Sequence, residues 1–99
     1  MSTMTFDWDP AKNRANQKKH GLSFEDAVGV FEAEGDALEL FDEKHSEFED
    51  RFITIGPIQG GLVLVIWTER VDDIIRVISA RWATLSERRL YRRHMEQRR

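Results

Sequence analysis

The stretch RFITIGPIQGGLVLVIWTERVDDIIRVISAR, residues 51–81, decides the fold. Three of its runs are rich in β-branched and aliphatic residues and predict consecutive strands at 52–58, 62–69 and 74–81. Gln59-Gly60-Gly61 predicts a tight hairpin between the first two, because glycine readily adopts the positive φ of such turns. Apolar side chains occupy both parities of the middle run, so we expect it to be the central strand of an antiparallel sheet, covered on both faces.

Two helices are predicted before these strands. The first begins at Asp9-Pro10, a typical N-cap followed by proline, and ends at about Lys19 before Gly21. It has almost no apolar stripe, so something other than a hydrophobic face must hold it. The second is expected over residues 24–33. Its apolar positions have the i, i+3, i+4, i+7 spacing of an amphipathic helix: Phe24, Ala27, Val28 and Phe31.

The remaining elements complete an α+β domain. Residues 6–8 predict a short strand, residues 37–41 an edge strand, and the capping box at 84–87 a last helix that ends at about Gln97. The thin apolar side of that helix consists of Leu85, Leu90 and Met95. We expect a single domain over residues 1–99, with a curved, mostly antiparallel four- to five-stranded sheet, two helices near the N-terminus and one C-terminal helix.

Length and composition exclude several classes of protein. The chain has 99 residues, of which 40% are hydrophobic and 33% charged, as in a small folded domain. It has no cysteine, which excludes disulfides, a thiol nucleophile and a cysteine-ligated zinc site. The longest apolar run is far shorter than the roughly 20 residues that span a bilayer, and residues 1–9 lack the pattern of a signal peptide. We therefore expect a cytoplasmic protein.

Charge is segregated along the chain, although its formal net charge is only −3. Residues 25–50 carry eleven acids and one lysine, a net charge of −10. Residues 76–99 carry eight arginines and two glutamates, a net charge of +6, and residues 1–24 carry +2. A moderate overall pI therefore hides two basic regions that suit a polyanion.

Charged side chains gather where two of the predicted strands meet. Glu69 and Arg70 end one strand and Arg76 lies on the next, across a short connector, while Arg81 leaves the far end of that strand. Strict alternation places Arg76 and Arg81 on opposite faces unless a bulge re-aims one of them. These residues could form a binding site, or only surface ion pairs worth about 0–1 kcal/mol.

The last helix carries stacked arginines. The i, i+4 spacing places Arg88 over Arg92 and Arg89 over Arg93, and repulsion between like charges favours a bound anion. That anion could be a phosphate or the acidic side chains of this chain or a partner, and a solvated arginine-rich tail is the alternative. The histidines are dispersed and no acids have metal-ligand spacing, so we expect no metal site and no cofactor.

A series of motifs covers nearly the whole chain: residues 6–14 with Asn16, 19–21, 23–25 with Ala27, Arg51-Phe52 with 54–56, Thr68-Glu69-Arg70, 75–81 and Glu87-Arg88. In this order they resemble the BrnT toxins of bacterial type II toxin–antitoxin systems. The resemblance implies a RelE-like fold and a ribonuclease that blocks translation when it is free. The connector Val71-Asp72-Asp73 departs from the family pattern, because it lacks the glycine expected after Glu-Arg.

The resemblance also implies a partner. This would be a BrnA-like antitoxin with a ribbon-helix-helix part, and operator DNA would be bound only through it. Because such domains bind DNA as dimers, we expect two copies of this chain in the complex, and no membrane contact. The alternative is a non-catalytic co-repressor that only holds its partner on DNA.

Metal-independent RNA cleavage needs a base, an acid and cations near the phosphate. Arg76 and Arg81, with Arg70 as a third, are the candidates for phosphate, because guanidinium stays charged and binds two oxygens at once. His20 and Glu69 are the candidates for proton transfer, although His20 could instead only cap the first helix. The candidates for RNA-backbone contact are Lys12, Lys19, Arg88 and Arg89, and Trp67 or Trp82 could stack on a base or lie in the core.

Overall fold

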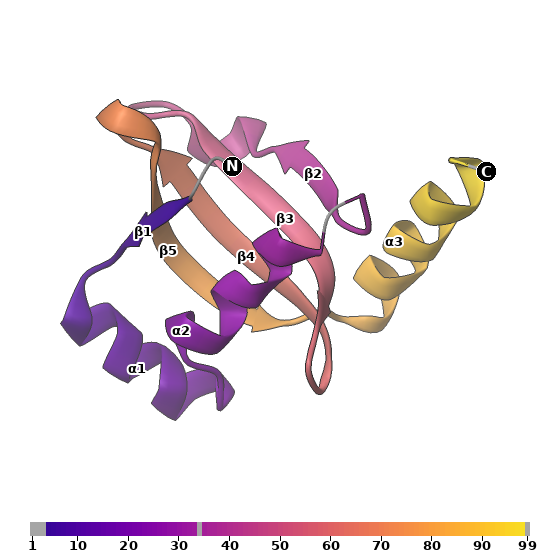
Figure 1. The fold of residues 1–99 in the computed structure, drawn as a ribbon, viewed down its shortest axis with the longest axis horizontal. Coiled ribbons are helices and arrows are strands. Elements are labelled where there is room, and N and C mark those ends of the chain that lie inside the picture. The colour runs from indigo at the N-terminus through magenta and orange to yellow at the C-terminus, as the bar shows by residue number, and fades with distance from the viewer. Residues whose placement is uncertain (1–3, 34, 99) are drawn as a thin grey trace.

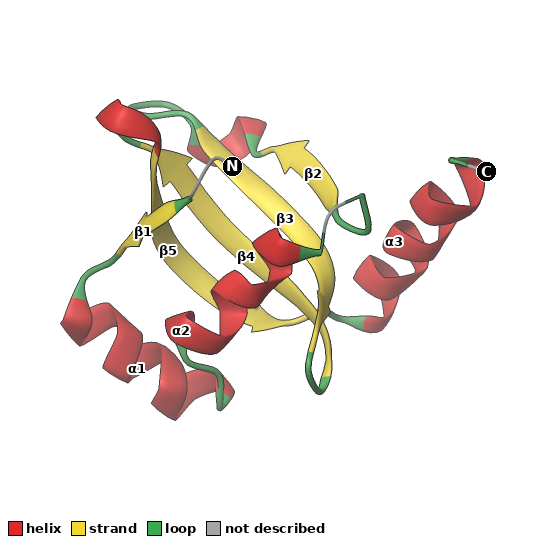
Figure 2. Ribbon diagram, in the orientation of Figure 1, coloured by secondary structure: helices red, strands yellow, loops and turns green. Residues whose placement is uncertain are grey.

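A five-stranded mixed sheet forms the centre of the molecule (Figures 1 and 2). The computed structural model describes residues 4–33 and 35–98, and its strands follow the order β1-β5-β4-β3-β2. Strand β1 pairs with β5 in parallel, and the other pairs are antiparallel. The strands are β1 (Thr5–Asp7), β2 (Leu38–Phe41), β3 (Arg51–Ile58), β4 (Gly61–Glu69) and β5 (Ile74–Trp82). The predicted α+β class, the central position of β4 and the edge position of β2 are confirmed.

Helices cover the two faces of the sheet unequally. Helix α2 (Phe24–Ala27) and the following 3₁₀ segment (Val28–Glu32) pack on one face, where Phe24 and Trp67 belong to the main core. Helix α3 (Leu85–Gln97) packs beside the opposite face, where Tyr91 contacts a smaller cluster. The buried members of that cluster are Leu38, Ile55 and Leu64. We call this second face the open face.

Two asparagines hold helix α1 (Pro10–His20) to the sheet. The Asn16 side-chain amide donates to the carbonyls of Leu22 (2.9 Å) and Ala80 (2.7 Å), and the Ala80 N–H donates to Asn16 Oδ1 (3.4 Å). The Phe24 N–H donates to Asn13 Oδ1 at 2.9 Å. Both asparagines are buried, so polar contacts replace the apolar stripe that this helix lacks.

The second predicted helix is not continuous. Its α-helical part ends at Ala27, and residues 28–32 form a 3₁₀ helix. Gly29 and the β-branched Val28 and Val30 have low helix propensity, which favours the change to the tighter 3₁₀ form. The other boundaries differ little from the predictions, since β1 covers residues 5–7, α1 includes His20 and β2 begins at Leu38.

The predicted apolar side of α3 is largely wrong. Leu85 and Leu90 are 54% and 40% exposed, and Tyr91 packs against the open face instead. The Tyr91 hydroxyl also donates to the Asp36 carbonyl at 2.6 Å. The helix therefore leaves two leucines on its solvent side.

The connector that lacks the expected glycine still forms a turn that suits one. Asp73 has φ +59°, in the left-handed region, at the end of a 3₁₀ turn (Val71–Asp73). Aspartate tolerates this region better than most residues, at a cost of about 1–2 kcal/mol. The Arg70 N–H donates to the Ile74 carbonyl across the turn at 2.8 Å, so β4 and β5 meet here as expected.

Loss of the Asn16 amide should destabilise the protein. Asn16→Ala leaves the buried Leu22 and Ala80 carbonyls without their donor, which we expect to lower the free energy of unfolding by about 2–3 kcal/mol. Urea unfolding measures the change. Lys18→Ala, an exposed position on the same helix, is the control. Equal stability of the two variants would show that the asparagine contacts do not hold α1.

Candidate functional site

A bulge in β5 brings Arg76 and Arg81 to one face of the sheet. Ile66 pairs with Ser79 and Trp67 with Val77, so one extra residue lies on β5 between these pairs. Arg76 then lies opposite Thr68, and Arg81 opposite Leu64. Because Leu64 and Thr68 are four residues apart on β4, both arginines emerge on the open face, with their Cα atoms roughly 13 Å apart. The bulge that strict alternation required is present.

Arg81 is fixed by α3. Its two terminal guanidinium nitrogens donate to the two carboxylate oxygens of Glu87 at 2.7 and 2.8 Å. Glu87 also accepts from the Thr84 N–H at 2.8 Å, as the second half of the capping box. The hydrogen bonds from Arg81 are the main cause that lowers the pKa of Glu87 to about 2, and the pair raises the pKa of Arg81. The bidentate binding edge of the Arg81 guanidinium is therefore occupied by the Glu87 carboxylate.

Arg76 lies in a row of polar residues at the other end of the open face. Asp7 on β1 lies next to Arg76, and its carboxylate accepts from the Arg76 guanidinium at 2.5 Å. Thr68 lies opposite Arg76 on β4, and Arg51 opposite Thr68 on β3. We call these four residues the polar row. Asp7 and Arg51 were not among the predicted site residues, because the parallel pairing of β1 with β5 and the β3 register leave no local signal in the sequence.

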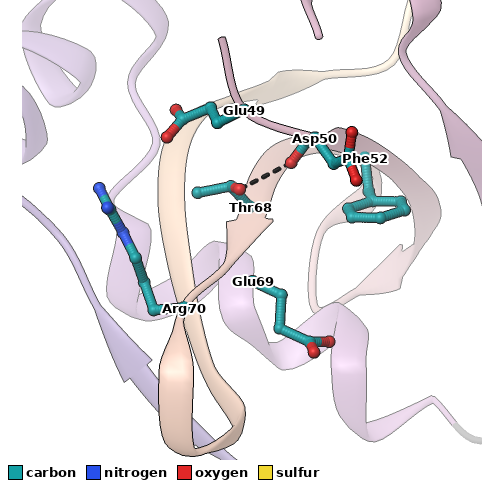
Figure 3. A pocket seen from close by; sticks show the side chains of 6 residues that line it. All are labelled: Glu49, Asp50, Phe52, Thr68, Glu69 and Arg70. Atoms are coloured by element: carbon teal, nitrogen blue, oxygen red, sulfur yellow. Dashed lines mark hydrogen bonds between the residues drawn. The ribbon is translucent and has the colours of Figure 1, made fainter.

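Arg70 and Glu69 point in opposite directions at the end of β4 (Figure 3). Arg70 extends beside Thr68, at the rim of the polar row, whereas Glu69 pairs with Ile75 on the opposite face. A hollow of about 380 Å³ lies at this end of the sheet, lined by Glu49, Asp50, Phe52, Thr68, Glu69 and Arg70. Three of these six side chains are acidic, so phosphate is favoured only on the Arg70 side.

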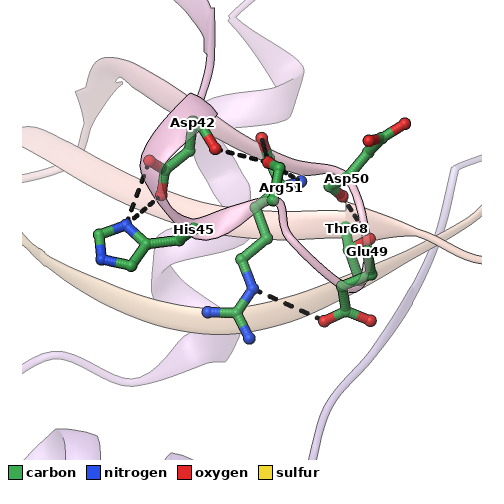
Figure 4. A network of polar contacts seen from close by, with 7 residues as sticks. Asp42, His45, Glu49, Asp50, Arg51 and Thr68 are labelled. Atoms are coloured by element: carbon green, nitrogen blue, oxygen red, sulfur yellow. Dashed lines mark hydrogen bonds and ion pairs between the residues drawn. The ribbon is translucent and has the colours of Figure 1, made fainter.

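The segment before β3 is tied down by hydrogen bonds (Figure 4). The Asp42 N–H donates to the Arg51 carbonyl at 2.8 Å, and the Thr68 hydroxyl donates to the Asp50 carbonyl at 2.6 Å. Asp42 is buried and its carboxylate contacts the His45 ring at 3.0 Å. These contacts fix the backbone from which the Arg51 side chain extends.

His20 lies apart from the polar row. It is the last residue of α1, half-buried, and one turn beyond Asn16, which contacts Ala80. Gly21 follows with φ +66° and closes the helix by donating to the Gln17 carbonyl. His20 therefore lies toward the Arg81 end, and the structure does not bring it together with Glu69.

The four candidates for RNA-backbone contact do not form one surface. Lys12 and Lys19 are exposed on α1, whereas Arg88 and Arg89 are exposed on α3, at the other side of the molecule (Figure 1).

The two candidate stacking tryptophans differ in exposure. Trp67 is only 6% exposed, its Nε1 donates to Thr54, and its ring stacks on Phe52, so of the two predicted alternatives it lies in the core. Trp82 is 39% exposed and stays a candidate.

Within residues 4–33 and 35–98, no group of three histidine, aspartate or glutamate side chains is arranged to hold a metal ion. Nor does any helix in this part of the chain have the length and apolar character needed to cross a membrane.

Glu87 should make stability depend on pH in the acid range. Because its pKa is lowered from 4.5 to about 2, its pair with Arg81 stabilises the fold fully above about pH 4.5, and this contribution is lost as the pH falls toward 2. In the Glu87→Gln variant, the free energy of unfolding should fall by roughly 1–2 kcal/mol less over this pH range than in the wild type. The difference is this small because solvent screens the partly exposed pair. Urea unfolding of both proteins across this range measures the difference, and a pH-independent difference would contradict the assignment.

Comparisons with known proteins agree with this architecture. The family described as "Ribonuclease toxin, BrnT, of type II toxin-antitoxin system" matches residues 8–87. The crystal structure of the Brucella abortus ribonuclease toxin BrnT superposes with a TM-score of 0.64 and 31% identity, over 83% of this chain and 99% of that one. A comparison with curated proteins gives no match. The family match covers most of the chain, and the chain therefore belongs to the BrnT family of type II toxin–antitoxin ribonuclease toxins.

Proposed function

We propose that this toxin acts in the cytoplasm and cleaves RNA without a metal ion, using Arg76 as the main phosphate ligand. The observation that carries the proposal is the β5 bulge, which places Arg76 and Arg81 on one open face. Arg70 extends beside Thr68, the residue that pairs with Arg76. Guanidinium groups bind phosphate oxygens in pairs and stabilise the charge that builds up on them during cleavage. Arg81 would contribute through its remaining N–H groups, because one N–H of each terminal guanidinium nitrogen is already bonded to Glu87.

The chemistry would follow the usual course of metal-free RNA cleavage. A base takes the proton of the 2′-hydroxyl, the 2′-oxygen bonds to phosphorus, and the 5′-oxygen leaves with a proton from an acid. His20 and Glu69 are the candidates from the sequence for these roles, but Glu69 lies on the face opposite to Arg76. Asp7 joins them, because it is the carboxylate in contact with Arg76. Asp7→Asn separates two functions of Asp7: a base would be lost, whereas a mere counter-ion of Arg76 could be removed without loss of cleavage.

Arg76→Ala should lower RNA cleavage by about a hundredfold or more, because it removes charge stabilisation in the transition state. Cleavage of a single-stranded RNA by the purified toxin, with and without EDTA, measures this, and EDTA should leave the wild-type rate unchanged. Growth arrest on expression without the antitoxin provides the readout in cells. Arrest that survives both Arg76→Ala and Arg81→Ala, in folded protein, would overturn the proposed phosphate site. A wild type that neither cleaves RNA nor arrests growth would favour the non-catalytic co-repressor.

Membership of a type II system implies an antitoxin protein, and we propose a BrnA-like ribbon-helix-helix protein that docks on α3. Two apolar side chains are exposed on this helix, Leu85 at 54% and Leu90 at 40%. Arg88 and Arg89 lie among them and are exposed. An acidic and apolar segment would complement this surface. Operator DNA would be bound by the antitoxin alone, in a complex with two copies of this chain.

The double variant Arg88→Ala/Arg89→Ala should slow association with the antitoxin by about tenfold at low salt, because opposite charges steer the encounter. The effect should shrink as salt shortens the Debye length from about 10 Å at 0.1 M. Stopped-flow association at several salt concentrations measures it. Lys12→Ala/Lys19→Ala removes the same charge from α1 and is the matched comparison. If only the α1 variant slows association, the antitoxin docks on α1 instead.

A further inference from the structure

We propose that Arg51 is a substrate-binding residue, and that Arg51, Arg76 and Arg70 together bind the phosphate backbone of RNA across the polar row. This inference rests on the proposed ribonuclease function and extends its site from β5 to β3. Register alone places the row: Arg51 faces Thr68, and Thr68 faces Arg76. Arg70 approaches the same place from the end of β4 (Figure 3).

The side chain of Arg51 has hydrogen-bonding capacity that the described part of the chain does not use. Its Nε is buried yet makes no hydrogen bond to any described residue. The nearest carboxylate oxygen, Glu49 Oε1, lies 3.6 Å away, close enough for an ion pair but too far for a good hydrogen bond. A guanidinium carries five N–H donors, and a buried donor without a partner costs free energy. An anion bound at Arg51 would meet that demand.

The geometry suits a phosphodiester between two arginines. Side chains directly opposite each other on neighbouring strands have Cβ atoms about 5 Å apart, so Arg51 and Arg76 flank Thr68 at roughly 10 Å. Thr68 is small and 4% exposed, and its hydroxyl already donates to the Asp50 carbonyl. It therefore leaves space for a phosphate between Arg51 and Arg76. Next along the same face lie Ile53 and Ile66, half-buried apolar side chains on which a ribose or base could rest.

The carboxylates that pair with Arg76 and Arg51 are exchangeable. Arg76 is paired with Asp7 through one nitrogen, and Arg51 with Glu49 at 3.6 Å, and all four side chains are 30–51% exposed. Exposed pairs of this kind contribute about 0–1 kcal/mol, so phosphate can displace the carboxylates at little cost. The Arg81–Glu87 pair differs, because it is bidentate and part of a helix cap. The phosphates of RNA should therefore bind at the polar row more readily than at the two Arg81 nitrogens that bind Glu87.

The test measures binding of a 2′-O-methyl oligonucleotide, which cannot be cleaved, by fluorescence anisotropy at several salt concentrations. Arg51→Gln should raise Kd by about tenfold and lower the slope of log K against log salt by about 0.7, the value for one phosphate contact on a single strand. Arg98→Gln removes one charge from an exposed position at the C-terminal end of α3 and should change neither. Glu49→Gln removes the competing carboxylate and should lower Kd by about threefold.

The outcomes separate this inference from the function on which it rests. If the wild type cleaves RNA while Arg51→Gln and Glu49→Gln both bind the oligonucleotide as the wild type does, Arg51 does not bind RNA and the inference fails, although the toxin is still a ribonuclease. If Arg51→Gln weakens only capture of the cognate antitoxin, the row faces that partner and the inference fails. A wild type that neither binds nor cleaves RNA would overturn both proposals. If Arg51→Gln does not fold, Glu49→Gln provides the test, because the inference expects this variant to lower Kd rather than raise it.

Discussion

The free edge of β5 is the constraint on which the rest of the structure depends. Strand β1 covers that edge only at residues 74–76, so the backbone beyond needs other partners. Asn16 supplies both a donor and an acceptor to Ala80, as a neighbouring strand would. The same asparagine binds the Leu22 carbonyl, and Asn13 caps the Phe24 N–H, so the helix that closes the edge also positions the next one. A polar helix is therefore stable here because its side chains complete a sheet.

The sequence predicts the elements better than it predicts their arrangement in space. The three long strands, the hairpin at residues 59–61 and both helix caps at Asp9 and Thr84 follow from local rules of periodicity and capping, and they are found. The break after Ala27 and the outward position of Leu85 depend on tertiary packing, which those rules do not contain. Family resemblance identified the class of protein, because its motifs run along nearly the whole chain.

The candidate site can be predicted only in part from the sequence, because pairing between distant strands leaves no local pattern. Arg76 and Arg70 are predicted together because a short connector joins their strands. Asp7 reaches Arg76 from 69 positions away, through a parallel pairing without a local signature. The bulge in β5 is likewise set by the fit of two strands, and it decides which face Arg81 occupies. Alternation can state that a bulge is needed, but it cannot show that one exists.

The ion pairs at the two ends of the open face differ in whether breaking them disturbs the fold. At the polar row, exposed carboxylates partner arginines whose release leaves the backbone unchanged, which suits reversible binding of RNA. At the other end, the same contact that neutralises Arg81 also caps α3, a helix with no buried residue among those described. A ligand that took the end of the Arg81 fork would have to release Glu87 and loosen the start of α3. By reciprocity, a partner that clamps α3 would hold Arg81 on Glu87 and so weaken its hold on phosphate. An antitoxin on α3 could then oppose RNA binding at Arg81 without covering that residue.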